Sequence, residues 1–345
     1  MGSLSSSAYS NNSISSLTPG RQPEVIVISK REFLCKTTSL KTIQKALEAF
    51  HRDGIVILQD AISHESLDHL HSQMTRDAEV LASSANPHFN HDKAARNLSQ
   101  QLPLTREYLH ENIWANPHAS AVLECILGPR PQLAFAGANT ALPNGTGRQA
   151  VHSDAYFRHL DFTFGVEVNI FLTDASSENG ATEVWPGTHV GYNHDHQVPG
   201  TRGWIKKEIL EQRARRFGPP VQPFVPKGGL LLRDLRMWHA GMPNRTLCPR
   251  IMLGFVYFPV WYQTPMRLTF PRKAKRALRS WKKIDAISVA EFVEGDVEHL
   301  SLPFRMNLTQ QEDGGIGRSP RKKRRIAAKP SVSEENYWVP PENTL

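Results

Sequence analysis

A histidine and an aspartate stand two residues apart in the stretch GRQAVHSDAYF (147–157). Residues two apart in an extended strand point to the same side of it, so His152 and Asp154 could present an imidazole and a carboxylate to one metal ion. Those two groups alone do not complete a site. Iron(II) held by two histidines and one carboxylate needs a second histidine from elsewhere in the chain, and it keeps open positions for other ligands. The pair therefore predicts a further histidine at the end of another strand.

His239 is the candidate second histidine. It follows GGLLLRDLRMW (228–238), whose apolar run is typical of a buried strand, and it precedes Ala-Gly, as a strand end would. Arg250 opens the next apolar stretch eleven residues later, so a hairpin could return it to the neighbourhood of His239. Arginine binds a carboxylate through two parallel hydrogen bonds. The spacing therefore suits an acid cosubstrate held by the metal at one end and by arginine at the other.

Other histidines compete for the same role. His159 and Asp161 repeat the two-residue spacing seven positions further on, and His194 and His196 flank an aspartate in YNHDHQ. We expect both groups to lie in loops, where they could line the mouth of the site or contact a substrate. A structural role is expected for His189.

The secondary-structure elements that must position these residues are predicted in a clear order along the chain, mainly helices in its first part and strands in its second. Apolar residues at helical spacing predict helices over 40–53, 64–82 and 119–127, whereas 85–105 is polar and is expected to form a loop. The basic segment 206–216 is expected to form a helix that could act as a lid. This order indicates an α+β fold built on a β-sandwich or barrel. Runs of β-branched and aromatic residues between Gly and Pro predict strands within 55–60, 132–142, 164–174, 181–190, 228–240 and 250–262.

Several stretches together resemble the phytanoyl-CoA dioxygenase family of iron(II)/2-oxoglutarate-dependent oxygenases, and look closest to its fungal members in secondary metabolism. The resemblance spans residues 40–262 and includes the opening helix and strand, EAFHRDGIVILQD. A lone His-x-Asp occurs by chance in many chains, but all the motifs in family-like order are far more specific. They are VHSDAYF, ENGATEVWPGTH, GGLLLRDLRMWHAGMPN and Arg250 after His239.

The resemblance implies a role for each matching residue. Its fold would be a double-stranded β-helix, a cupin-like jelly-roll core with N-terminal supporting helices. The reaction would consume O2 and 2-oxoglutarate to oxidise, in the first place to hydroxylate, an unactivated C–H of a small molecule. A free fungal metabolite is expected rather than a CoA thioester. His152, Asp154 and His239 would bind Fe(II), Arg250 would bind the distal carboxylate of 2-oxoglutarate, and Gln149 and Thr182 would also contact this cosubstrate.

The chain is expected to divide into three parts. Residues 1–30 are predicted to be disordered, 31–305 to form the dioxygenase domain, and 306–345 to form a basic, disordered tail. The three widely spaced cysteines fit a reducing compartment, and with no apolar run long enough to span a membrane they favour a cytoplasmic protein. The tail motif SPRKKRR (319–325) resembles a nuclear import signal and leaves nuclear location open.

Two alternatives from other functional classes remain. One is a catalytically inactive jelly roll that binds a ligand or a protein. The other is a nuclear oxygenase or regulator that acts on nucleic acid or chromatin, suggested by the net charge of +8. Aromatic residues interleaved at base-stacking spacing are absent from the sequence, which argues against nucleic acid. A homodimer is left open, and the loops 85–105, 155–164 and 190–226 are expected to line the substrate pocket.

Overall fold

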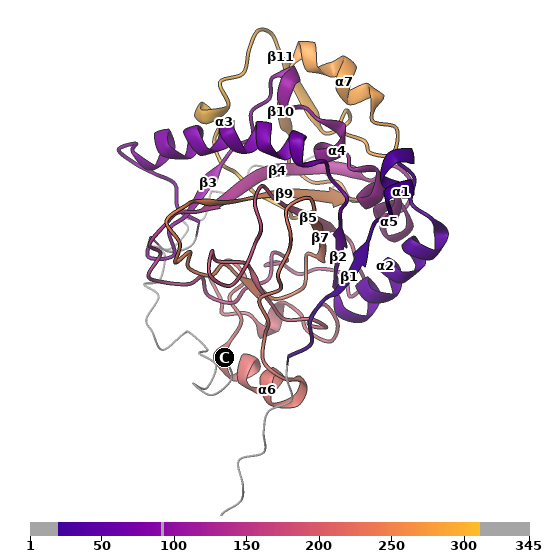
Figure 1. Ribbon diagram of the computed structural model, residues 1–345. Helices are drawn as coiled ribbons and strands as arrows, with labels where there is room; N and C mark the ends of the chain where they lie inside the picture. Colours follow the sequence, from indigo (N-terminus) through magenta and orange to yellow (C-terminus); the bar gives the residue numbers. More distant parts are fainter. Residues whose placement is uncertain (1–19, 91–92, 311–345) are drawn as a thin grey trace, which may run out of the picture.

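A large mixed β-sheet organises the protein (Figure 1). The computed structural model describes residues 20–90 and 93–310. The strands follow the order β1-β2-β7-β5-β9-β4-β3, and every neighbouring pair is antiparallel except β1 with β2. These strands are β1 (Glu24–Val27), β2 (Ile55–Gln59), β3 (Asn97–Gln100), β4 (Gln132–Ala141), β5 (Val166–Phe171), β7 (Leu230–Asp234) and β9 (Arg250–Phe258).

Helices cover one face of this sheet, and long loops lie on the other (Figure 1). The predicted helices over 40–53 and 64–82 are confirmed. The first ends at Gly54, whose φ of 73° suits glycine, and α5 begins at Asn116, whose side chain caps it. The α-helices are α1 (Lys30–Cys35), α2 (Leu40–Asp53), α3 (His64–Ala82), α4 (Glu111–Trp114), α5 (Pro117–Leu127), α6 (Lys207–Phe217) and α7 (Lys275–Ser280), and short 3-10 helices span Arg106–Tyr108, His194–His196, Arg272–Ala274 and His299–Ser301.

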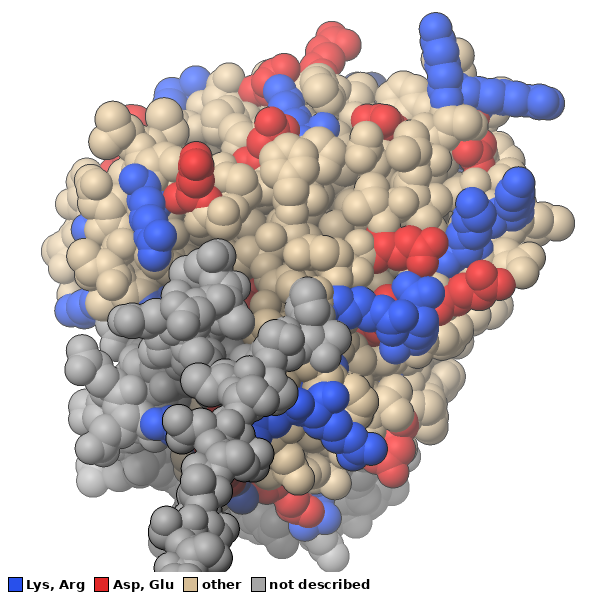
Figure 2. All heavy atoms as spheres, turned by 60° about the horizontal axis from the view of Figure 1, so that its bottom comes forward, with Lys and Arg blue, Asp and Glu red and all other residues tan. Residues whose placement is uncertain are grey.

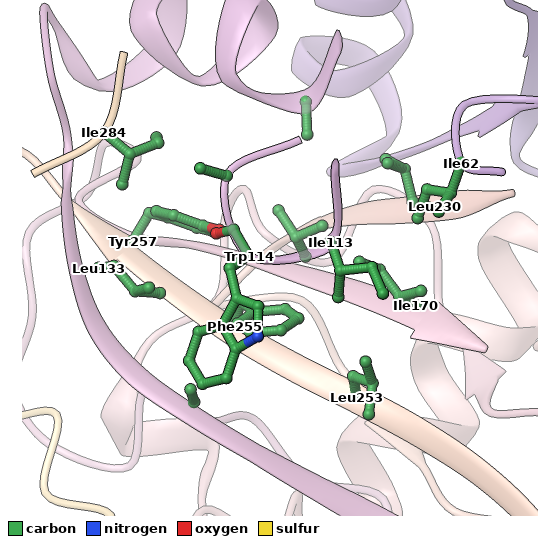
Figure 3. Packing of buried hydrophobic residues seen from close by; sticks show 14 of the residues in the cluster. Ile62, Ile113, Trp114, Leu133, Ile170, Leu230, Leu253, Phe255, Tyr257 and Ile284 are labelled. Atoms are coloured by element: carbon green, nitrogen blue, oxygen red, sulfur yellow. The ribbon is translucent and has the colours of Figure 1, made fainter. Parts of the chain in front are cut away.

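The main hydrophobic core lies between the helices and the sheet. Side chains alternate across a strand, so Val166, Val168 and Ile170 of β5 all point into this core. Trp114 packs at its centre, with its ring centroid 5.3 Å from that of Phe255 (Figure 3). The same alternation sends every second residue of β5, β7 and β9 to the opposite face, where the polar side chains gather.

The layer on that opposite face contains little regular structure. Its strands β6 (Glu183–Val184) and β8 (His239–Ala240) form a two-stranded sheet, extended by single bridges such as His152 to His239. A separate parallel pair joins β10 (Leu268–Pro271) to β11 (Ala290–Val293). The second sheet of the sandwich is therefore short, and loops complete this wall.

The prediction of a loop over 85–105 is wrong for part of its length. Residues 97–100 form β3, which pairs with β4 at one edge of the large sheet. The strand carries the polar sequence Asn-Leu-Ser-Gln, yet all four residues are buried. A polar edge strand lacks the apolar alternation by which strands are predicted from sequence.

The ordered domain extends beyond both of its predicted ends. Strand β1 and its parallel pairing with β2 lie inside the segment 1–30 that was predicted to be disordered. At the other end Leu308 is buried, and its carbonyl accepts a hydrogen bond of 2.9 Å from the Tyr262 hydroxyl. The rest of the predicted tail, including the basic motif at 319–325, lies outside the described residues, as do residues 1–19. Within the described ranges, no helix is both long and apolar enough to cross a membrane.

Replacement of Trp114 tests the core. Trp114→Ala should lower the free energy of unfolding by about 3–5 kcal/mol, because it removes a buried ring and leaves a cavity. Urea denaturation monitored by circular dichroism measures this change. Leu247→Ala is the control, since Leu247 is 85% exposed and its truncation should change stability by at most about 0.5 kcal/mol. Equal effects of the two substitutions would contradict this view of the core.

Candidate active site

Three residues that the sequence singled out meet on the loop side of the sheet. The ligand atoms of His152, Asp154 and His239 all lie within 4.8 Å of one another, and all three residues are buried. Two backbone hydrogen bonds, each of 2.9 Å, join His152 to His239 in an antiparallel bridge. This bridge brings the ring centroids to 4.3 Å. The structure therefore places His239, and neither His159 nor His194, beside the His-x-Asp pair.

Both histidines present Nε2 to the centre of this cluster. His152 Nδ1 lies 2.8 Å from the carbonyl of Ala150, and His239 Nδ1 lies 3.2 Å from that of Met237. A nitrogen that donates its proton to a carbonyl leaves the other nitrogen as the one able to bind a metal. Burial lowers the pKa of both histidines, which favours the neutral imidazole that a metal requires.

Asp154 is held by an arginine. Its Oδ2 accepts a hydrogen bond of 2.8 Å from Nη2 of Arg233 and lies 3.6 Å from Nε2 of His239. Burial by itself raises the pKa of Asp154, but nearby positive charge outweighs burial and holds that pKa well below its usual range. His239 contributes most to this lowering and Arg233 next, and Arg233 also donates the hydrogen bond. The cluster therefore offers one ionised carboxylate and two imidazoles to a metal ion.

Arg250 reaches the same cavity, of ≈ 280 Å³, from the start of β9. Its Nη2 donates to the carbonyl of Gly180, while Nη1 is buried and finds no hydrogen-bond partner among the residues that the structure describes. Burial lowers the pKa of Arg250 to about 10. An unpaired guanidinium nitrogen inside a protein is costly, and a carboxylate is the ligand that best matches it. The two histidines and the carboxylate of the cluster therefore fit a metal ion, and Arg250 fits the carboxylate of an acid cosubstrate.

Gln149 and Thr182 line the same cavity. The side-chain oxygen of Gln149 accepts a hydrogen bond of 2.8 Å from the backbone N–H of Gly241. A Cβ atom at Gly241 would lie only 2.7 Å from that side chain, so any larger residue there would displace the Gln149 amide. Thr182 lies across from Met252, with 3.7 Å between Oγ1 and the sulfur. Every residue that the sequence assigned to the site thus lies around one cavity.

The phytanoyl-CoA dioxygenase (PhyH) family profile matches residues 50–252. The chain belongs to the phytanoyl-CoA dioxygenase family. As a member, it is a non-haem iron dioxygenase that depends on 2-oxoglutarate, which confirms the sequence-based assignment of the enzyme class and cofactors. The match covers well over half of the chain and contains the motifs from which the resemblance was inferred.

Individual relatives are distant in sequence. Dioxygenase andF of Emericella variicolor is 21% identical over 217 residues, which span 59% of this chain and 70% of andF. The epimerase SnoN, in complex with Fe3+ and α-ketoglutarate, superimposes with a TM-score of 0.51 at 16% identity over 64% of this chain and 85% of SnoN. EctD from S. alaskensis superimposes with a TM-score of 0.51 at 20% identity. The match covers 73% of this chain and 86% of EctD. These likenesses confirm the predicted cupin-like jelly-roll fold.

The competing histidines lie outside the cavity. His159 stacks on Phe164, and the backbone carbonyl of Asp161 accepts a hydrogen bond from Arg236, so that segment is part of a loop. His194 and His196 form a short 3-10 helix on the surface. His189 lies 3.1 Å from the carbonyl of His51 and helps to join this layer to α2.

The predicted lid segment does form a helix, α6, but its buried side chains pack against tryptophans beside the site and do not face the cavity. The loops expected to line the cavity do so at only a few positions. His88, Asn90 and Asn97 come from the first, Tyr156 from the second and Arg202 from the third. Most of the remaining lining comes from the strands of the large sheet.

Sequence reasoning missed two charged residues in the wall of the cavity. Glu167 and Arg233 are direct partners in the register of β5 with β7, and Arg233 Nη2 donates to the Glu167 carboxylate. Burial raises the pKa of Glu167 to about 7, against the opposing charge of Arg233. The sequence did carry a signal for them. Glu167 interrupts the apolar run GVEVNIF and Arg233 follows the apolar start of LLLRD, and charged side chains are rarely buried without a specific partner. Residues 304–306 also line the cavity and were missed, because they stand where the predicted domain ends at 305 and the predicted tail begins at 306.

Removal of a ligand tests the cluster. Asp154→Ala or His239→Ala should weaken Fe(II) binding by more than the about tenfold to hundredfold typical of residues that only support a ligand. Anaerobic calorimetry on metal-stripped protein measures this affinity. His159→Ala is the matched control and should bind as the wild type does. Wild-type affinity in His239→Ala, or a loss in His159→Ala, would show that the ligands are misassigned.

Proposed function

We propose that this enzyme hydroxylates an unactivated C–H bond of a small organic molecule, in the biosynthesis of a fungal secondary metabolite. His152, Asp154 and His239 hold iron(II), and Arg250 binds the distal carboxylate of 2-oxoglutarate. Gln149 and Thr182 line the part of the cavity that receives 2-oxoglutarate. The observation that carries the proposal is the unpartnered Nη1 of Arg250, which lies in the same cavity as the three-ligand cluster.

The chain's own residues prepare the reaction by position and charge. When bound, the iron and 2-oxoglutarate supply, with O2, the oxidant that can replace an unactivated hydrogen by hydroxyl, with succinate and carbon dioxide as coproducts. Two histidines and one carboxylate leave metal positions open for the cosubstrate and oxygen. Arg250 fixes the far end of the cosubstrate, so its reactive end is oriented before the substrate arrives.

The remaining cavity wall fits a compact substrate with both apolar and polar parts. Phe135, Phe304 and Met306 offer apolar surface that excludes water, while Asn139 and Tyr156 offer hydrogen bonds. A volume of ≈ 280 Å³ lies at the small end of ligand cavities and has to hold the cosubstrate as well. This size favours a free metabolite over a CoA thioester.

Two relatives support the biosynthetic part of the proposal. Dioxygenase andF comes from the fungus Emericella variicolor, and SnoN is described as an epimerase from nogalamycin biosynthesis. EctD was crystallised with 2-oxoglutarate and 5-hydroxyectoine, a hydroxylated small molecule. Cys35, Cys125 and Cys248 are all free and exposed, which favours a reducing compartment such as the cytoplasm.

The alternative functions receive less support. An inactive binding protein has no need of an intact three-ligand cluster beside a buried arginine whose Nη1 finds no partner among the described residues. On the face shown in Figure 2, lysine and arginine side chains lie among aspartates and glutamates and do not gather into a stripe that would follow a nucleic-acid backbone.

Arg250 gives the sharpest kinetic test. Arg250→Met should raise the KM for 2-oxoglutarate, because a hydrogen bond to a charged group contributes about 1.5–3 kcal/mol, or about tenfold to a hundredfold. Succinate release without added substrate, measured against 2-oxoglutarate concentration, reports this KM. Arg213→Met is the control, since Arg213 is buried on α6 outside the cavity. An unchanged KM in Arg250→Met would exclude the assigned role.

The reaction type needs a separate experiment. Incubation with terpenoid, polyketide and alkaloid metabolites under ¹⁸O2 should give a product that gains one labelled oxygen atom, together with labelled succinate. High-resolution mass spectrometry detects both. A product that has instead lost two hydrogen atoms would contradict hydroxylation and indicate desaturation.

A further inference from the structure

A single buried guanidinium joins the candidate metal site to a second carboxylate. Nη2 of Arg233 donates to Oδ2 of Asp154 and also to Oε2 of Glu167. Its Nη1 lies 3.1 Å from Nδ1 of His239, a contact that is not a hydrogen bond while Nδ1 keeps the proton that it donates to the Met237 carbonyl. The Arg233 side chain is only 3% exposed. One side chain thus contacts two of the three candidate ligands and a carboxylate that is not one of them.

Glu167 is placed to become a fourth protein ligand of the metal, which would block a position that the cosubstrate or oxygen needs. It lines the same cavity as the three-ligand cluster, and it shares one nitrogen of Arg233 with Asp154, so the two carboxylates lie close together. Its Oε1 accepts a hydrogen bond of 2.7 Å from Asn169, and its carboxyl group also interacts with that of Asp154. A carboxylate released next to a divalent cation binds it, and each added protein ligand occupies a position that the cosubstrate or oxygen requires.

The charges around Arg233 support this view. Arg233 supplies the one positive charge that contacts the carboxyl groups of both Asp154 and Glu167. Without Arg233 the two carboxylates would be unopposed, and a metal ion would be the nearest cation able to neutralise them. Strand register makes this arrangement specific, since Glu167 and Arg233 are paired residues on adjacent β5 and β7.

We propose that Arg233 is a positioning residue that restrains Asp154 and keeps Glu167 out of the metal's coordination sphere, so that positions stay open for 2-oxoglutarate and oxygen. This inference rests on the proposed function of the site. Arg233 touches no reacting atom and acts only through the carboxylates it binds.

The test separates metal binding from cosubstrate binding. Metal-stripped wild type, Arg233→Met, Glu167→Gln and the double variant Arg233→Met/Glu167→Gln are titrated anaerobically with Fe(II) by calorimetry, then with 2-oxoglutarate by the visible absorption of its iron chelate. Arg233→Met should bind Fe(II) at least as tightly as the wild type. Its half-saturating concentration of 2-oxoglutarate should rise by at least about tenfold, as expected for a residue that orients a ligand.

The double variant shows whether Glu167 causes the loss of affinity for 2-oxoglutarate in Arg233→Met. Removing Glu167 from the Arg233→Met protein should restore most of the affinity for 2-oxoglutarate, because the competing carboxylate is gone. The proposal would be overturned if Arg233→Met and the double variant bind 2-oxoglutarate equally weakly while circular dichroism shows that both are folded. Should Arg233→Met fail to fold, Glu167→Gln is decisive: it should keep wild-type chelation, and loss of chelation would mean that Glu167 is needed at the metal.

Arg236→Met is the matched control. Arg236 is likewise buried, and its guanidinium pairs with Asp234, but it does not line the cavity. Its replacement should lower stability and leave both titrations unchanged. Failure of the wild type to bind Fe(II) would refute the proposed function itself, whereas wild-type behaviour of Arg233→Met would refute only the role of Arg233.

Discussion

Two backbone hydrogen bonds of 2.9 Å join His152 to His239, and the rest of the active site depends on them. The two residues are far apart in the sequence and lie in the layer with the least regular structure. Their bridge sets the distance between the imidazoles, and the strand-like spacing of His152 and Asp154 then brings the carboxylate to the same side.

The large sheet provides the rigid support for that bridge. Helices bury the apolar side chains of one face, with Trp114 at the centre, and the alternation of side chains leaves the other face for function. Glu167, Arg233 and Arg250 all reach the cavity from central strands of this sheet. Charged groups so placed are stabilised only by specific partners, since burial disfavours an ion without one. Strand register, rather than loop conformation, therefore sets the electrostatics of the site.

Much of this arrangement could be predicted from the sequence, because the decisive signals are local. Apolar runs mark β2, β7 and β9, and Gly54 marks the end of α2. The candidate ligands stand in motifs whose order and spacing are specific, although His152 forms only an isolated bridge and His239 opens the short strand β8. Strand β3 could not be predicted in this way, since its buried residues are polar and only their pairing with β4 makes them a strand.

The role of Arg233 illustrates a second limit. It follows an apolar run within its strand, and only the pairing of β5 with β7 shows that Glu167 faces it. The same holds for residues 304–306, whose place beside the cavity follows from the path of the chain around the sheet. Long-range pairing of this kind leaves no periodic signal in the sequence.

The central claim is that His152, Asp154, His239 and Arg250 together bind iron(II) and 2-oxoglutarate. An anaerobic titration of the metal-free wild-type protein with both components tests it most directly, by the weak visible absorption band of iron-chelated 2-oxoglutarate. The account predicts a band that saturates at one iron per chain and appears only when both components are present. Folded wild-type protein that develops no band would contradict it.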